Sequence, residues 1–205
     1  MTKRSIPIKQ YLLFDMNSVV RLLVISDVIW MGALGLLGPI FSLFVVEFIE
    51  GADASVAGTA AAIYLITKSI LQIPAASLID RIRGEKDDFW IMFLGSIAAA
   101  LIPLLYLVIR TPGQLYLVQF LYGGIVAFTF PSYMALFTRH IDRGREGTDW
   151  GIYFTLTDLS GAAAASIGGV LATKVGYHPL IVVLAGISLL GTLVLFPIRS
   201  FIFKK

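Results

Sequence analysis

The stretch Tyr64–Pro74, YLITKSILQIP, places one ammonium group, that of Lys68, in the middle of an otherwise uncharged run. The wider stretch Ser55–Ile79 is just as apolar, and Lys68 is its only charged residue. A helix needs about 20 predominantly apolar residues to cross the hydrocarbon core of a bilayer. The sequence around Lys68 therefore predicts a membrane-spanning helix with a cation at its centre.

Further stretches have the same character: Val28–Val46, Phe89–Ile109, Thr111–Thr138, Trp150–Thr173 and Val175–Ile198. Among these five, only Trp150–Thr173 contains a charge, that of Asp158. The 205-residue chain is 58% hydrophobic and 14% charged, whereas soluble proteins have about 25% charged residues. We therefore predict an all-α membrane protein with six transmembrane helices within residues 19–198, a cytoplasmic segment at 1–18 and a cytoplasmic tail at 199–205.

The residue inventory argues against an enzyme. The chain has no cysteine, which excludes disulfides, thiol nucleophiles and thiolate metal sites. Its two histidines, His140 and His178, fall near predicted loops without metal-ligand spacing. The hydrophobic stretches contain no paired carboxylates, no nucleophile with a neighbouring base and no phosphate-binding loop. We predict no catalytic activity, cofactor or metal, and ATP-driven transport would need a separate subunit.

Basic residues outside the hydrophobic stretches favour one side. That side carries Lys3, Arg4, Lys9, Arg21, Arg81, Arg83, Lys86, Arg139, Arg143, Arg145, Arg199, Lys204 and Lys205. The opposite side carries only Arg110 and Lys174. Short loops rich in Lys and Arg remain in the cytoplasm. We predict an integral protein of the inner or plasma membrane with both termini cytoplasmic, and this topology explains the basic charge without nucleic-acid binding.

Three ionisable residues lie within or at the edge of the predicted spans. At about 1.5 Å per residue, Lys68 is roughly 18 Å from Asp80 at the cytoplasmic surface, and Asp158 is roughly 14 Å from Asp149. Both are therefore near the midplane of a core about 30 Å thick. Asp27 is shallower. Such residues are costly in lipid and usually face a partner or a wet cavity, although partial solvation of Asp27, snorkelling of Lys68 or a purely structural ion pair are alternatives.

The two stretches with midplane charges also contain runs of small residues, AGTAAA at Ala57–Ala62 and SGAAAASIGG at Ser160–Gly169. Small residues allow helices to approach closely in membranes. Packing alone explains such runs in many proteins. Their coincidence with the midplane charges suggests that these two helices contact something else.

The sequence after the second span, ASLIDRIRGEKDD at Ala76–Asp88, resembles the loop signature of the major facilitator superfamily, with Asp80, Arg81, Gly84 and Lys86 matching in kind. Ala76 replaces the usual Gly, and Arg83 with Gly84 is displaced by one position. More weakly, LVQFLYGGIVAF at Leu117–Phe128 resembles the family's fourth helix, with Gln119 where many members have Arg.

The resemblance implies one half of a facilitator-type fold, built from two inverted three-helix repeats. In that fold the first and fourth helices line the central cavity, the second and fifth face the other half, and the third and sixth lie outside. Facilitators usually have two six-helix halves, so the second half would be another polypeptide. We expect a second copy in a parallel C2 homodimer, in which Lys68 pairs with Asp158 of the partner subunit.

We therefore predict a secondary transporter of a small sugar-like or drug-like organic solute, working by alternating access. Asp27 is expected to exchange the coupling proton, and the loop residues Asp80, Arg81 and Arg83 to act in gating, with simple cytoplasmic retention of the loop as the alternative. Expected substrate-binding residues are Trp30, Gln119, Tyr122, Phe130 and Tyr133, for each of which a packing role is an alternative. The rival readings are a non-transporting assembly or regulatory subunit, a heterodimeric half-transporter and a fragment of a twelve-helix parent.

Overall fold

A computed structural model describes residues 13, 16–82 and 84–203. Within these residues, six helical segments are long and apolar enough to cross a membrane, namely Ser18–Phe48, Ala54–Arg81, Lys86–Leu107, Pro112–His140, Glu146–Val175 and Tyr177–Ile202. The described part of the chain contains no strand. The predicted all-α membrane fold with six spans is confirmed, and each span extends beyond its charge-poor stretch at one or both ends.

Three of the spans contain short 3₁₀ segments. The first consists of α1 (Ser18–Leu37), η2 (Gly38–Ile40) and α2 (Phe41–Phe48); the third of α4 (Lys86–Leu101) and η3 (Ile102–Leu107); the last of α7 (Tyr177–Leu193), η4 (Phe196–Ile198) and α8 (Arg199–Ile202). The other spans are the single helices α3 (Ala54–Arg81), α5 (Pro112–His140) and α6 (Glu146–Val175). Each 3₁₀ segment contains a proline near its start, and proline removes a donor from the helical ladder.

Local sequence signals fix the helix ends. Asn17 and Asp53 cap the first turns of α1 and α3 by accepting hydrogen bonds from backbone N–H groups. Thr111 and Gln114 form a capping box at the start of α5. Gly176, with φ of +87°, separates α6 from α7 in a conformation that a residue with a Cβ rarely adopts.

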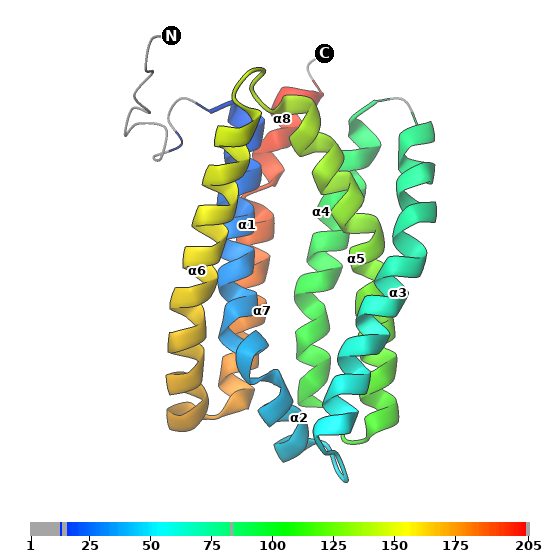
Figure 1. Ribbon diagram of the computed structural model, residues 1–205, viewed down its shortest axis with the longest axis vertical. Helices are drawn as coiled ribbons and strands as arrows, with labels where there is room; N and C mark the ends of the chain where they lie inside the picture. The colour runs from blue at the N-terminus through cyan, green and yellow to red at the C-terminus, as the bar shows by residue number, and fades with distance from the viewer. Residues whose placement is uncertain (1–12, 14–15, 83, 204–205) are drawn as a thin grey trace.

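The helices form two groups that lie side by side (Figure 1). α1 packs most extensively against α6 and then α7, while α5 packs most extensively against α3 and then α4. One group therefore contains the first, fifth and sixth spans, and the other contains the second, third and fourth. Each group takes two spans from one predicted three-helix repeat and one span from the other, and the inverted relation between the repeats stays a prediction.

Small residues bring α1 close to α6, and α5 close to α3. A Cβ added to Gly35 of α1 would lie 2.7 Å from the carbonyl oxygen of Gly161, and one added to Gly168 would collide with the backbone of Leu36. In the other group, a Cβ on Gly123 would lie 2.7 Å from the carbonyl oxygen of Tyr64. Part of the small-residue run in α6 is thus used for packing within the chain.

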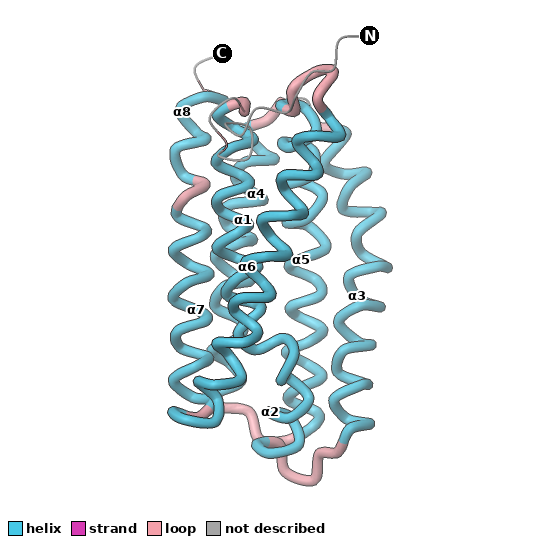
Figure 2. Tube along the Cα trace, turned by 60° about the vertical axis from the view of Figure 1, so that its left-hand side comes forward, coloured by secondary structure: helices cyan, strands magenta, loops and turns pink. Residues whose placement is uncertain are grey.

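The described chain begins and ends at the same end of the bundle (Figures 1 and 2). The loop residues between α3 and α4 and between α5 and α6 lie at that end, and the short connections before α3, α5 and α7 lie at the other. An even number of crossings produces this arrangement. The assignment of this end to the cytoplasm stays a prediction, and so do the predicted boundaries of the terminal segments.

Candidate functional site: a central pocket between the two helix groups

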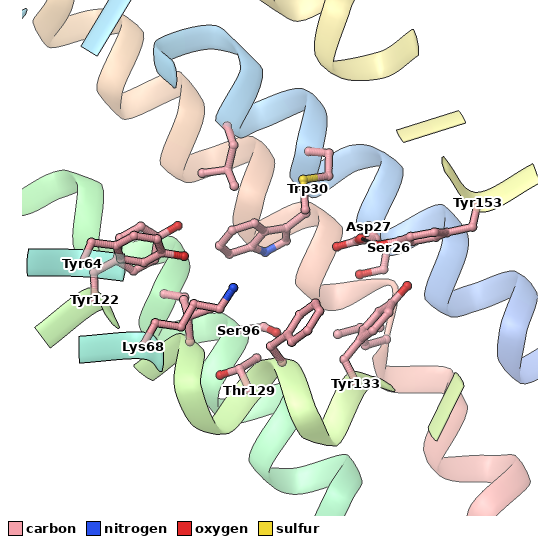
Figure 3. Close-up of a pocket in the computed structure, with 16 residues that line it drawn as sticks. Ser26, Asp27, Trp30, Tyr64, Lys68, Ser96, Tyr122, Thr129, Tyr133 and Tyr153 are labelled. Atoms are coloured by element: carbon pink, nitrogen blue, oxygen red, sulfur yellow. Dashed lines mark hydrogen bonds between the residues drawn. The ribbon is translucent and has the colours of Figure 1, made fainter. Parts of the chain in front are cut away.

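A pocket of about 180 Å³ lies between the two helix groups and is lined by side chains from all six spans. α1 and α5 supply most of the lining (Figure 3). The full lining is Ser26, Asp27, Trp30, Met31, Leu34, Tyr64, Lys68, Ser96, Ala99, Tyr122, Val126, Thr129, Phe130, Tyr133, Tyr153 and Leu195. Four of the five residues predicted to bind substrate are among them, and their role in binding stays a prediction.

Lys68 enters the pocket from α3 (Figure 3). Its Nζ lies 4.8 Å from the centre of the Phe130 ring on α5, within the range of a cation–π contact. The described residues provide no carboxylate within ion-pair distance of this ammonium group. An aromatic face compensates only part of the lost hydration of a cation, because such a contact contributes about 0.5–2 kcal/mol.

Asp27 enters the same pocket from α1 (Figure 3). The hydroxyl of Tyr153 on α6 donates a hydrogen bond of 2.6 Å to its Oδ2. Tyr153 in turn packs near Tyr133, with ring centres 6.3 Å apart. The Tyr133 hydroxyl is buried and has no partner at hydrogen-bonding geometry among the described residues. The pocket thus holds a carboxyl group, a cation and a buried hydroxyl on different helices.

Trp30 is oriented by α7. Its indole N–H donates to the hydroxyl of Thr192 at 3.2 Å. One turn earlier on α1, the Ser26 hydroxyl donates to the carbonyl oxygen of Gly191 at 2.8 Å. Two hydrogen bonds between neighbouring helices hold this side of the pocket, so the indole ring presents a fixed surface to it.

A second pocket, of about 420 Å³, lies beside η2 and η3. It shares Leu34, Tyr64 and Tyr122 with the central pocket, and the rings of the two tyrosines lie 5.1 Å apart. Gln119, the fifth predicted binding residue, lines this second pocket and donates from Nε2 to the Tyr106 hydroxyl at 3.0 Å. Gln119 therefore lines a different pocket from Trp30, Phe130 and Tyr133, and Tyr122 lines both pockets.

Asp158 lies away from both pockets. It is exposed on the outer face of α6, with exposed small residues one and two turns further along, Ala162 and Ser166. No cation pairs with it among the described residues. Its role as the counter-ion of Lys68 in a second copy stays a prediction.

The predicted gating residues Asp80 and Arg81 are exposed at the end of α3, and Arg83 lies outside the described residues. The contacts between this loop and α5 are made by other residues. Arg139 forms an ion pair with Asp88 and donates to the carbonyl oxygen of Gly84, and the His140 ring lies 3.7 Å from the Glu85 carboxylate. The gating role of the first three stays a prediction.

The sequence argument did not select several pocket residues: Ser26, Tyr64, Ser96, Thr129 and Tyr153. It also did not place Lys68 in the pocket. Spacing offered one signal, because Tyr64 lies one turn before Lys68 and Asp27 lies one turn before Trp30, so each pair shares a helix face. The pairing of Tyr153 with Asp27 had no such signal, since it depends on the packing of α6 against α1.

Six apolar helices around a pocket with polar groups are typical of a polytopic membrane protein. The sequence profile of the Major Facilitator Superfamily matches residues 23–201. The chain belongs to this superfamily, as its loop signature indicated. Family membership points to a transporter and not to an enzyme. Comparison with curated proteins finds no match for this chain.

Proposed function

We propose that the protein is a proton-coupled secondary transporter of a small organic solute, operating by alternating access as a parallel homodimer with both termini in the cytoplasm. The observation that carries the coupling is the carboxyl group of Asp27, which faces the central pocket and accepts a hydrogen bond from Tyr153. A carboxyl group in a pocket that opens alternately to the two sides can take up a proton on one side and release it on the other. Transport of the solute would then follow the proton gradient.

The dimer proposal rests on the outer face of α6. A carboxylate exposed to hydrocarbon is costly, and the exposed Asp158 has neighbours small enough for a helix to pack closely on it. A second copy offers a cation of matching depth, that of Lys68. In this arrangement α6 of one subunit contacts α3 of the other, twice over by symmetry.

Coupling is tested in proteoliposomes with an imposed pH gradient and a panel of labelled sugars, organic anions and organic cations. We expect the gradient to raise uptake of at least one compound several-fold in the wild type and not in Asp27→Asn. The control is Asp53→Asn, since Asp53 is an exposed carboxylate in a loop, and it retains the gradient effect. If uptake is the same with and without the gradient in both the wild type and Asp27→Asn, the protein is not proton-coupled.

The assembly is tested by measuring the mass of the purified protein in detergent, with the detergent contribution subtracted. Twice the chain mass supports the homodimer. A single chain mass contradicts it, and a complex with a different polypeptide favours the heterodimeric or accessory readings.

A further inference from the structure

The central pocket contains a carboxyl group and an ammonium group, and the ammonium group, that of Lys68, has no counter-ion among the described residues. The Asp27 carboxyl already accepts a hydrogen bond of 2.6 Å from Tyr153. The Lys68 ammonium has an aromatic ring, at 4.8 Å, as its contact, and no carboxylate within ion-pair distance among the described residues. A cation that has left water is stabilised far better by an anion that hydrogen-bonds to it than by a ring alone. The pocket therefore offers a place for a negatively charged group at Lys68.

The remainder of the pocket suits an apolar or aromatic body. Trp30, held by Thr192, and Phe130, beneath the Lys68 ammonium, present rings from two facing helices. Most of the remaining lining is aliphatic or aromatic. Besides the charges of Asp27 and Lys68, the polar groups of the lining are mostly hydroxyls of serine, threonine and tyrosine, and that of Tyr133 is buried. Pockets of this composition bind molecules that are mainly apolar and carry a small number of polar groups.

We propose that the central pocket binds an organic monoanion, whose carboxylate contacts Lys68 and whose aromatic body lies among Trp30, Phe130 and Tyr133. This inference deepens the proposed function by naming the substrate class, and it rests on that function for the claims that the bound solute is moved and that Asp158 of a second copy balances Lys68 in its absence. A single Lys supplies one point charge with three donors, which matches one carboxylate. This class is narrower than the sugar-like or drug-like solute predicted from the sequence, because it takes into account that Lys68 lines the pocket.

The proposal gives Lys68 two counter-ions in different states. In a dimer without solute, the ammonium is balanced by Asp158 of the second copy. With solute bound, the carboxylate of the solute takes that place. Binding of an anion and pairing across the dimer therefore compete, so an anion shifts the equilibrium between the two states by its preference for one of them.

Equilibrium binding to the purified protein in lipid nanodiscs tests the proposal, with no gradient present. The probes are 3-phenylpropionate, phenylalanine and phenethylamine, which share a phenyl ring and carry an anion, a zwitterion and a cation. Thermal-shift titration and quenching of tryptophan fluorescence give the apparent Kd. We expect the anion to bind most tightly, Lys68→Met to weaken it by about tenfold or more, and Lys68→Arg to retain most of the affinity.

Lys174→Met is the matched control, because Lys174 is an exposed lysine near the end of α6, away from the pocket, and it leaves binding unchanged. A Trp30→Leu variant weakens binding of the anion, but the protein still binds the anion more tightly than the cation. The proposal is overturned if the cation or the zwitterion binds more tightly than the anion, if none of the probes binds, or if a folded Lys68→Met binds the anion like the wild type. A failed flux assay with intact, Lys68-dependent anion binding would remove the transport proposal and leave this one standing.

Discussion

The inner face of α3 and the outer face of α6 each carry one charge deep in the predicted membrane, but one faces the interior of the bundle and the other its exterior. Lys68 points into the central pocket and contacts Phe130 (Figure 3). Asp158 is exposed on the outside of the bundle and lines neither pocket. In the sequence the two residues look equivalent, since each is the single charge of an apolar stretch at a similar depth. The comparison teaches that sequence position determines the depth of a charge, whereas helix packing determines the direction in which it points.

The largest effect is expected from exchanging these two charges. If Lys68 and Asp158 balance each other across a dimer, Lys68→Asp or Asp158→Lys alone leaves a pair of like charges at the seam. Loss of one partner of a buried pair costs about 3–5 kcal/mol, so the dimer fraction in detergent falls sharply in each single variant. The double variant recovers it. A double variant no more dimeric than either single one contradicts the pairing.

A smaller effect is expected on the inner face of α6. Gly168→Ala drives a methyl group into the backbone of Leu36 on α1, and overpacking of this kind costs about 1–3 kcal/mol. Thermal unfolding in detergent therefore shows a lower Tm. Gly169→Ala is the neighbouring control, since a Cβ there meets nothing within 4 Å. Equal Tm values for the two variants would show that α1 and α6 can separate without loss.

At the end of the bundle that contains the chain termini, Arg139→Gln removes the partner of Asp88. The Asp88 side chain is 1% exposed and that of Arg139 is 36% exposed. Because solvent screens the guanidinium, we expect a cost of about 1 kcal/mol, seen as a modest fall in Tm. Arg143→Gln, an exposed arginine in the following loop, leaves Tm unchanged. A transport defect in Arg139→Gln and not in Asp80→Asn would assign the gate to the α4–α5 contact.

The smallest effect concerns the loop before α3. The Ser55 hydroxyl and the backbone N–H groups of Ser55 and Val56 donate to Asp53 and hold the pKa of its carboxyl below its ordinary value. The cap is therefore fully present above that ordinary value and is lost as the pH falls through the lowered pKa. Asp53→Ala lowers Tm slightly at pH 7, and the difference from the wild type shrinks in acid. A difference that grows in acid contradicts this account.

The fold was largely predictable because the membrane constrains it so strongly. Six charge-poor stretches, separated by charged loops, allow few arrangements other than six spanning helices. The helices continue past the charge-poor stretches. Arg21 lies inside α1, since a helix continues into the interfacial region where charged side chains remain near water, and Asp27 lies inside α1 because its carboxyl faces the central pocket.

The site was only partly predictable. The aromatic residues of the first and fourth spans could be predicted, because the family resemblance indicates which helices face inwards, and Trp30, Tyr122, Phe130 and Tyr133 do line the pocket. The direction of Lys68 and the contact between Tyr153 and Asp27 depend on the rotation of α3 and α6, which close contacts at Gly123 and Gly168 set. Hydrophobic periodicity cannot fix such rotations when a helix is apolar on nearly every side.

The tyrosines shared by the two pockets have a kinetic consequence. Tyr64 and Tyr122, with Leu34, belong to the lining of both chambers, so they form the partition through which a solute would travel from one chamber to the other. A solute that passes between the chambers has to displace these three side chains, and rotation about their χ angles would do so without a backbone movement. Passage at this level would then be timed by rotamer jumps, which are intrinsically faster than the collective motion of helices.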